Sequence, residues 1–147
     1  MDVRRLQPED RPQWEPLWQG YLQFYEHELD TAVTDGTWDR VAGDGAAVVG
    51  LGAFDGPVLV GICHLVFHPS TWSTSSYCYL EDLFVRPDRR GGGVGRSLIA
   101  AAAGEAERVG ASKLYWQTHS NNGTARGLYD RVAEHRGFIV YEVDLPS

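Results

Sequence analysis

The sequence predicts an α/β (α+β) fold in which helices flank a mixed, mainly antiparallel sheet. Residues 46–54 and 58–67 are apolar runs that flank Asp55-Gly56, a two-residue hairpin signal. Residues 77–85 alternate and are rich in aromatic and branched side chains, which is typical of a strand. These three runs therefore predict an antiparallel meander at the centre of the sheet.

The next two segments predict a parallel strand beside the meander. Residues 98–109 are alanine-rich and have a helical period, and residues 113–116 form a short strand-like run. A strand, a helix and a second strand in succession imply a right-handed crossover. We therefore expect residues 77–85 and 113–116 to pair in parallel.

The remaining elements follow from the same patterns. Residues at helical spacing predict an amphipathic helix from residue 12 to about residue 28, with a core-facing stripe of Trp14, Leu17, Trp18, Tyr21, Leu22 and Tyr25. We also expect a first strand at 3–6, a short helix at 37–41, a helix from 123 to about 135, and a final strand at 138–145.

Length and composition predict one domain over residues 1–147, with 43% hydrophobic residues to build its core. No run reaches the length of a transmembrane helix and the start lacks the apolar stretch of a signal peptide, so we expect a cytoplasmic protein. Cys63 and Cys78 lie in expected strands without metal-ligand spacing, which predicts buried free thiols and no metal site.

The charge distribution narrows the class of partner. The net charge is −7, yet residues 86–96 hold four arginines and one aspartate, a local charge of +3. A small basic site on an acidic body disfavours nucleic acid, which needs an extended basic face. It suits an anionic cofactor and a cationic amine substrate, and no membrane partner is expected.

The basic site coincides with a glycine-rich joint between the strand 77–85 and the helix that follows it. Here Arg90-Gly91-Gly92-Gly93-Val94-Gly95-Arg96 supplies glycines that let phosphate groups approach the backbone at a helix N-terminus. A Walker A loop would need Lys and then Ser or Thr after its last glycine. A dinucleotide fingerprint would need a small residue where Leu98 or Arg96 stands.

This joint resembles the acyl-CoA signature of the GCN5-related N-acetyltransferases, Arg/Gln-x-x-Gly-x-Gly/Ala. A second block, Asn122-Gly123-Thr124-Ala125-Arg126-Gly127-Leu128-Tyr129, is similar to that family's Asn-x-x-Ala-x-x-Leu-Tyr helix, and Gly137-Phe138 follows it. The strand residues 79–85 are similar to those of the diamine (spermidine/spermine-type) acetyltransferases within the family. The resemblance implies a splayed parallel strand pair with acetyl-CoA in the gap.

The resemblance also implies which residues bind the cofactor. Main-chain groups of the strand would bind pantetheine, the glycine joint would hold the pyrophosphate, and the second block would line the sulfur end. The implied cofactor-binding residues are Leu83, Phe84, Val85, Arg90, Gly91, Gly92, Gly93, Val94, Gly95, Arg96, Asn122 and Ala125.

The chemistry would be direct attack of an amine on acetyl-CoA in a ternary complex. Tyr129 would protonate the leaving thiolate, and the Leu83 N–H would stabilise the oxyanion. Glu81 is the expected base or amine anchor, with Asp82 and Glu28 as further substrate-binding carboxylates. Glu81 and Asp82 point to opposite faces of a regular strand, so only one faces the site unless a bulge intervenes, and Asp82 or a water relay stays open as the base.

The acceptor stays open as well. A small polyamine-like amine competes with a protein lysine or N-terminus, and a noncatalytic acyl-CoA-binding module is the rival class. The chain ends after one strand where the family normally has two, which would leave an exposed sheet edge. We therefore expect a homodimer that pairs through residues 138–143.

Overall fold

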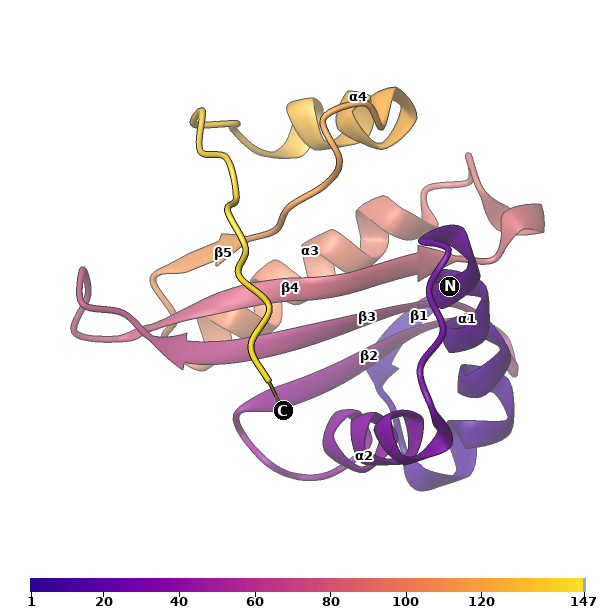
Figure 1. Cartoon of the computed structure of the whole chain (residues 1–147). Helices are drawn as coiled ribbons and strands as arrows, with labels where there is room; N and C mark the ends of the chain where they lie inside the picture. Colours follow the sequence, from indigo (N-terminus) through magenta and orange to yellow (C-terminus); the bar gives the residue numbers. More distant parts are fainter. Residues whose placement is uncertain (147) are drawn as a thin grey trace. The chain divides into compact units, whose positions relative to one another are not determined.

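A computed structural model describes residues 1–146, which divide into two compact units, 1–116 and a second that begins at Gln117. Each unit is described by itself, and the single-domain expectation stays a prediction. The first unit holds a five-stranded sheet in the order β1-β2-β3-β4-β5 (Figure 1). Its strands are β1 (Asp2–Arg5), β2 (Val48–Asp55), β3 (Val58–Pro69), β4 (Ser76–Val85) and β5 (Lys113–Tyr115).

Neighbouring strands are antiparallel from β1 to β4, and β5 runs parallel to β4. The predicted class, a mixed and mainly antiparallel sheet with one parallel pair, is therefore confirmed. The helices are α1 (Arg11–Phe24), α2 (Thr31–Val41), α3 (Val94–Arg108) and α4 (Gly123–Val132), with 3-10 turns η1 (Pro8–Asp10) and η2 (Pro87–Arg89). Within residues 1–146, none of the helices has the length and apolar character needed to cross a bilayer.

Helices cover both faces of the sheet. Gly61 faces α3, because a Cβ atom there would lie 2.8 Å from Val94 Cγ1. The next residue, Ile62, points to the other face, where it packs in one buried cluster with Trp14 of α1 and Trp38 of α2. Figure 1 shows the same arrangement, with α3 on the far side of the strands from α1 and α2.

The aromatic stripe of α1 forms the core of this face, as its spacing predicts. Trp14, Leu17, Trp18 and Leu22 are buried, and the rings of Trp14 and Trp18 stack with centroids 5.6 Å apart. Tyr25 is exposed because the helix ends at Phe24 rather than near residue 28. The physical reason is local, since Glu26 adopts a left-handed backbone with φ of +53°.

Two further element boundaries differ from the sequence prediction. Helix α2 begins at Thr31, ahead of the predicted residue 37, because the Asp30 side chain accepts a hydrogen bond from the Val33 amide and caps it. In the β2–β3 hairpin, Asp55 pairs with Val58. The turn is therefore Gly56-Pro57 rather than Asp55-Gly56, and Gly56 has φ of +58°.

The predicted final strand at 138–145 is wrong for the part of the chain that the structure describes. Helix α4 ends at Val132, short of residue 135, and residues 133–146 form neither helix nor strand. A strand forms only when a neighbour completes its hydrogen bonds, and no described strand pairs with this segment. Its large apolar side chains are exposed, namely Phe138, Ile139, Val140, Tyr141, Val143 and Leu145.

The contact between α2 and β2 makes a stability prediction. A Cβ atom on Gly50 would lie 2.6 Å from the Val41 carbonyl oxygen, so Gly50→Ala must displace backbone and should lower the free energy of unfolding by about 1–3 kcal/mol. Gly36→Ala is the control, because Gly36 lies in α2 with open space around it and should gain about 0.5–1 kcal/mol. Urea denaturation measures both, and an unchanged Gly50→Ala midpoint would contradict the packing.

Candidate functional site

The ladder between β4 and β5 stops early. β5 pairs only with the first part of β4, through Tyr77↔Lys113, Cys78↔Leu114 and Tyr79↔Tyr115. β4 continues to Val85, so residues 80–85 have no described ladder partner on the β5 side. Unpaired strand groups at this place are available to a ligand.

The direction of the β4 amides follows from one hydrogen bond. The Arg86 N–H donates to the Val60 carbonyl of β3 at 2.9 Å. Because strand amides alternate in direction, the N–H groups of Leu83 and Val85 point away from β3, toward the side that β5 leaves open. The Val85 carbonyl shares this direction and accepts a hydrogen bond from Arg90 Nε at 3.1 Å.

The glycine joint leads from β4 into α3 with open backbone. Gly91 and Gly93 have φ of +83° and +85°, a left-handed conformation that favours glycine. Gly93 is the N-cap of α3, and no atom lies within 4 Å of a Cβ placed on Gly91 or Gly93. A phosphate group can therefore approach the first amides of a fifteen-residue helix, where the helix dipole favours negative charge.

The arginines in and just before the glycine joint differ in their partners. Arg86 pairs with Asp88 at 2.8 Å, and Arg89 pairs with Asp55 of the β2–β3 hairpin at 2.6 Å. The hydrogen bond from Arg89 lowers the pKa of Asp55. Arg96 is exposed in the first turn of α3, so the sum of +3 over residues 86–96 overstates the charge that an anion would meet.

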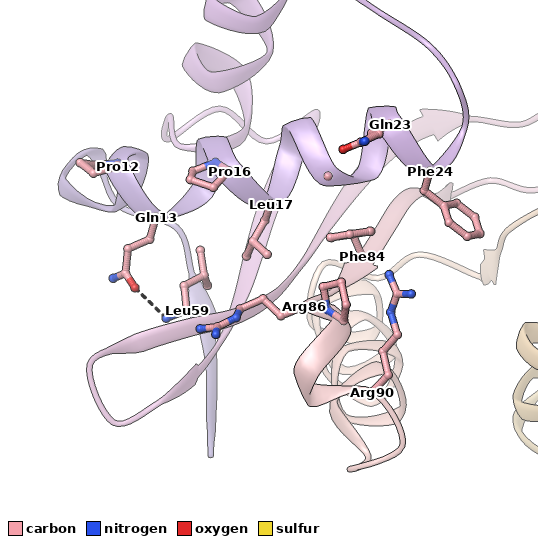
Figure 2. A pocket seen from close by; sticks show the side chains of 12 residues that line it. Pro12, Gln13, Pro16, Leu17, Gln23, Phe24, Leu59, Phe84, Arg86 and Arg90 are labelled. Atoms are coloured by element: carbon pink, nitrogen blue, oxygen red, sulfur yellow. Dashed lines mark hydrogen bonds between the residues drawn. The ribbon is translucent and has the colours of Figure 1, made fainter.

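Arg90 lies against aromatic rings at the edge of a pocket that the sequence did not indicate. The pocket has a volume of about 650 Å³ and lies between α1 and the adjoining ends of β3 and β4. Figure 2 shows Arg90 extending toward Phe84 and Phe24, and its guanidinium lies 5.2 Å and 6.0 Å from their ring centroids. A mainly apolar cavity thus adjoins the glycine joint, with Arg86 and Arg90 at its border.

A bulge in β4 places the two expected carboxylates. His64 pairs with Asp82 and Leu65 with Leu80, so Glu81 is the extra residue without an opposite partner. The bulge lies where the β4–β5 ladder has already ended. Desolvation by its surroundings, and then the charge of Asp82, raise the pKa of Glu81, although much of the residue faces solvent.

Asp82 has a buried partner that the sequence analysis missed. His64 Nδ1 lies 2.8 Å from Asp82 Oδ2, and the imidazole is 2% exposed. Burial, followed by the charge of Asp82 and a hydrogen bond with it, raises the pKa of Tyr21 on α1. The one sequence feature that points to such a partner is a histidine, His64, inside the apolar run 58–67.

The second unit holds the other expected site residues. The Asn122 side chain accepts a hydrogen bond from the Ala125 amide at 3.4 Å and so caps α4. Tyr129 lies seven residues after Asn122, on the same face of the helix, and is half-buried. Glu28 lies in the first unit, exposed in the loop between α1 and α2. The roles of these residues stay predictions.

A shortened parallel strand, unpaired β4 amides and a glycine joint at a helix N-terminus together fit a site for an extended, phosphate-bearing cofactor such as CoA. Comparison with known proteins agrees. The model described as "Acetyltransferase (GNAT) family" matches residues 3–133. The chain therefore belongs to the GCN5-related N-acetyltransferase family, whose cosubstrate is acetyl-CoA and whose acceptors are amines.

The similar proteins named here each cover two thirds or more of the chain. "D-amino-acid N-acetyltransferase HPA3" of Saccharomyces cerevisiae is 30% identical over 142 residues, which cover 95% of this chain and 88% of the relative. "Thialysine N-epsilon-acetyltransferase" of Caenorhabditis elegans is 32% identical over 103 residues, 67% of this chain and 64% of the relative. The structure of a ribosomal-protein-alanine N-acetyltransferase from Brucella melitensis biovar Abortus 2308 has a TM-score of 0.79 and 25% identity, covering 99% of this chain and all of that one.

The glycine joint makes a binding prediction. Gly95→Val puts a branched side chain in the first turn of α3, where cofactor phosphates would approach, so it should weaken acetyl-CoA binding by roughly 100-fold or more. Gly104→Val makes the same change later in α3, in open space, and should bind normally. Calorimetry measures both affinities. Equal affinity for the two variants would remove the pyrophosphate assignment.

Proposed function

We propose that this N-acetyltransferase acetylates a small, cationic primary amine by direct attack in a ternary complex. The observation that carries the proposal is the pair Glu81 and Asp82 at the β4 bulge, beside the part of β4 that β5 leaves unpaired. Two carboxylates attract an ammonium group, and the Leu83 N–H one residue further points to the open side. Similarity to the thialysine acetyltransferase favours an acceptor with a side-chain-like amine.

The reaction needs a neutral amine, because a protonated amine has no lone pair. In the proposed step, Asp82 anchors the ammonium and Glu81 accepts one of its protons. The nitrogen then bonds to the acetyl carbonyl carbon, and the resulting oxyanion accepts a hydrogen bond from the Leu83 N–H. A raised pKa makes Glu81 a stronger base than an ordinary glutamate once it is ionised.

Collapse of the intermediate breaks the carbon–sulfur bond and releases the CoA thiolate. We assign its protonation to Tyr129, because an ordinary tyrosine, with a pKa near 10, still carries its proton at neutral pH. Overall the amine nitrogen loses two protons and sulfur gains one. The ammonium gives its first proton to Glu81, the cationic nitrogen of the intermediate gives its second to water, and Tyr129 gives one to sulfur. Solvent then restores both groups.

Glu81→Gln tests the base. The wild-type rate should increase with pH as Glu81 loses its proton. This increase should occur at a higher pH than an ordinary glutamate would give, because burial and the charge of Asp82 raise the pKa of Glu81. The charge of Arg40 acts on the pKa of Glu81 in the opposite direction. Glu81→Gln should abolish that rise and lower kcat/KM by roughly 10²-fold. A variant with the wild-type pH profile would point to Asp82 or a water relay.

The same assay tests the acceptor class. Thioester consumption is followed with diamines, lysine analogues, amino acids and a lysine peptide. Preference for diamines supports the proposal, whereas preference for the peptide would support a protein acetyltransferase. Binding of acetyl-CoA without turnover of any amine would support the noncatalytic module.

A second acceptor class is an amino acid, and one charge favours it. Arg40 is an exposed residue of α2 whose charge lowers the pKa of Glu81, against the larger effects that raise it. A guanidinium there could hold an acceptor carboxylate while Glu81 or Asp82 holds the amine. The name of the HPA3 relative is compatible with this class. Arg40→Ala should then raise KM for amino acids but not for diamines.

Tyr129→Phe tests the proton donor. Phenylalanine keeps the ring of this half-buried residue, so cofactor affinity should hardly change. Loss of the hydroxyl should lower kcat by roughly 10²-fold. Steady-state kinetics with calorimetry of acetyl-CoA separate the two effects. Wild-type kcat across the pH range would remove Tyr129 from the reaction.

A homodimer is part of the proposal. Ile139, Tyr141 and Val143 are 73%, 87% and 84% exposed, and β5 is an edge strand of the sheet. A second copy would cover such side chains and edges by an isologous contact. Sedimentation should therefore give a dimer, and Tyr141→Asp should shift it toward monomer. A wild-type monomer at every concentration would contradict the dimer.

A further inference from the structure

A buried chain of hydrogen bonds stands behind one carboxylate of the proposed amine site. It joins Trp14 of α1, His64 of β3 and Asp82 of β4, and all three belong to the first unit. Trp14 is fully buried, His64 is 2% exposed and the Asp82 side chain is 14% exposed. Within this series of hydrogen bonds, Asp82 is thus the member that reaches solvent.

The chemistry of the indole fixes the protonation of the imidazole. Trp14 Nε1 lies 3.0 Å from His64 Nε2, and an indole nitrogen can only donate. His64 Nε2 must therefore be the acceptor and carry no proton. A neutral imidazole then has its proton on Nδ1, from where it donates to Asp82 Oδ2 at 2.8 Å.

This arrangement stops proton transfer at Asp82. A second proton on His64 could bind only at Nε2, which the Trp14 N–H occupies. His64 therefore serves Asp82 as a donor and not as a proton relay. His64 bonds Oδ2, and Tyr21 also makes a hydrogen bond with the carboxylate. A carboxylate has about four lone-pair sites, so acceptor capacity remains for an ammonium group.

The surroundings make the position of His64 rigid. The Trp18 ring lies 5.5 Å from the imidazole and stacks on Tyr21 at 5.5 Å. Trp18 Nε1 itself donates to Thr34 Oγ1 at 3.2 Å, so a second buried indole is fixed one helical turn from Trp14. The register of β3 against β4 also fixes this contact, because it places His64 and Asp82 directly opposite each other next to the bulge.

We propose that Trp14 and His64 are positioning residues that orient the Asp82 carboxylate as the anchor for the acceptor's ammonium group. This inference rests on the proposed function, since it concerns the same amine site. A fixed carboxylate presents one oxygen to the ammonium and binds it without losing rotational freedom. The pair would therefore govern the KM of the cationic acceptor more than cofactor affinity or kcat.

The direct test compares two replacements of His64. His64→Leu removes the donor to Asp82 and should raise KM for a diamine by about tenfold, with acetyl-CoA affinity and kcat changed less than about threefold. His64→Asn keeps an N–H near the position of Nδ1 and should restore KM to within about threefold of wild type. A folded His64→Leu protein with wild-type KM would overturn the inference.

A double-mutant cycle distinguishes positioning from general packing. If His64 acts through Asp82, adding His64→Leu to Asp82→Asn should not raise KM further, because the orientation it supplies no longer matters. Additive effects would mean that His64 acts independently of Asp82 and would overturn the proposal. Acetyl-CoA affinity, measured in each variant, reports whether the fold survives.

Trp14→Phe and Trp18→Phe form the matched pair of variants on α1. Both shorten a buried indole, but only the first removes the N–H that fixes His64. Trp14→Phe should raise KM for the diamine by about threefold or more, and Trp18→Phe should raise it clearly less, because it removes ring contact with His64 but not the hydrogen bond. Equal KM changes in the two variants would assign the effect to packing.

Nitrogen NMR of the wild-type protein needs no variant and no substrate. The imidazole of His64 should be neutral with its proton on Nδ1. An Nε2–H tautomer or an imidazolium would overturn the inference whatever the activity. Failure of the wild-type protein to acetylate any amine would instead overturn the proposed function, and this inference with it.

Discussion

The length of β5 is the constraint on which the site depends. β5 has three residues and β4 has ten, so their ladder ends at Tyr79 and the C-terminal half of β4 is paired on one side only. An amide that is buried without a partner costs about 1–3 kcal/mol, so such a strand end favours a bound ligand that supplies acceptors. The bond from Arg86 to Val60 sets which amides face that side.

The bulge and the glycine joint lie at the two ends of the unpaired half of β4. Glu81 is displaced from the ladder at one end, and β4 passes through η2 into α3 at the other. The ion pair between Arg89 and Asp55 joins this turn to the β2–β3 hairpin. Phe84 lies between the bulge and the glycine joint, is 8% exposed and packs in the core of the α1 face. One strand can thus present carboxylates, unpaired amides and the glycine joint in a fixed order.

Much of this arrangement could be predicted from sequence because it is local. The apolar stripe from Trp14 to Leu22 predicts α1, and the succession of strand, helix and short strand predicts the parallel pair. What could not be predicted depends on cross-strand register. A bulge at Glu81 exists only relative to β3, and the bonds from Trp14 to His64 and from His64 to Asp82 join residues 50 and 18 positions apart. The prediction of a strand at 138–145 was wrong for a related reason. An alternating pattern predicts a strand, but it does not show which neighbouring strand is present to pair with it.

Amide hydrogen exchange at β4, with and without acetyl-CoA, tests the central claim most directly. The claim is that Leu83 and Val85 offer their N–H groups to the cofactor while Phe84 and Arg86 serve the sheet. Saturating acetyl-CoA should therefore slow exchange at Leu83 and Val85 strongly, and change Phe84 and Arg86 much less. Confirmed binding of acetyl-CoA with unchanged exchange at Leu83 and Val85 would contradict the account.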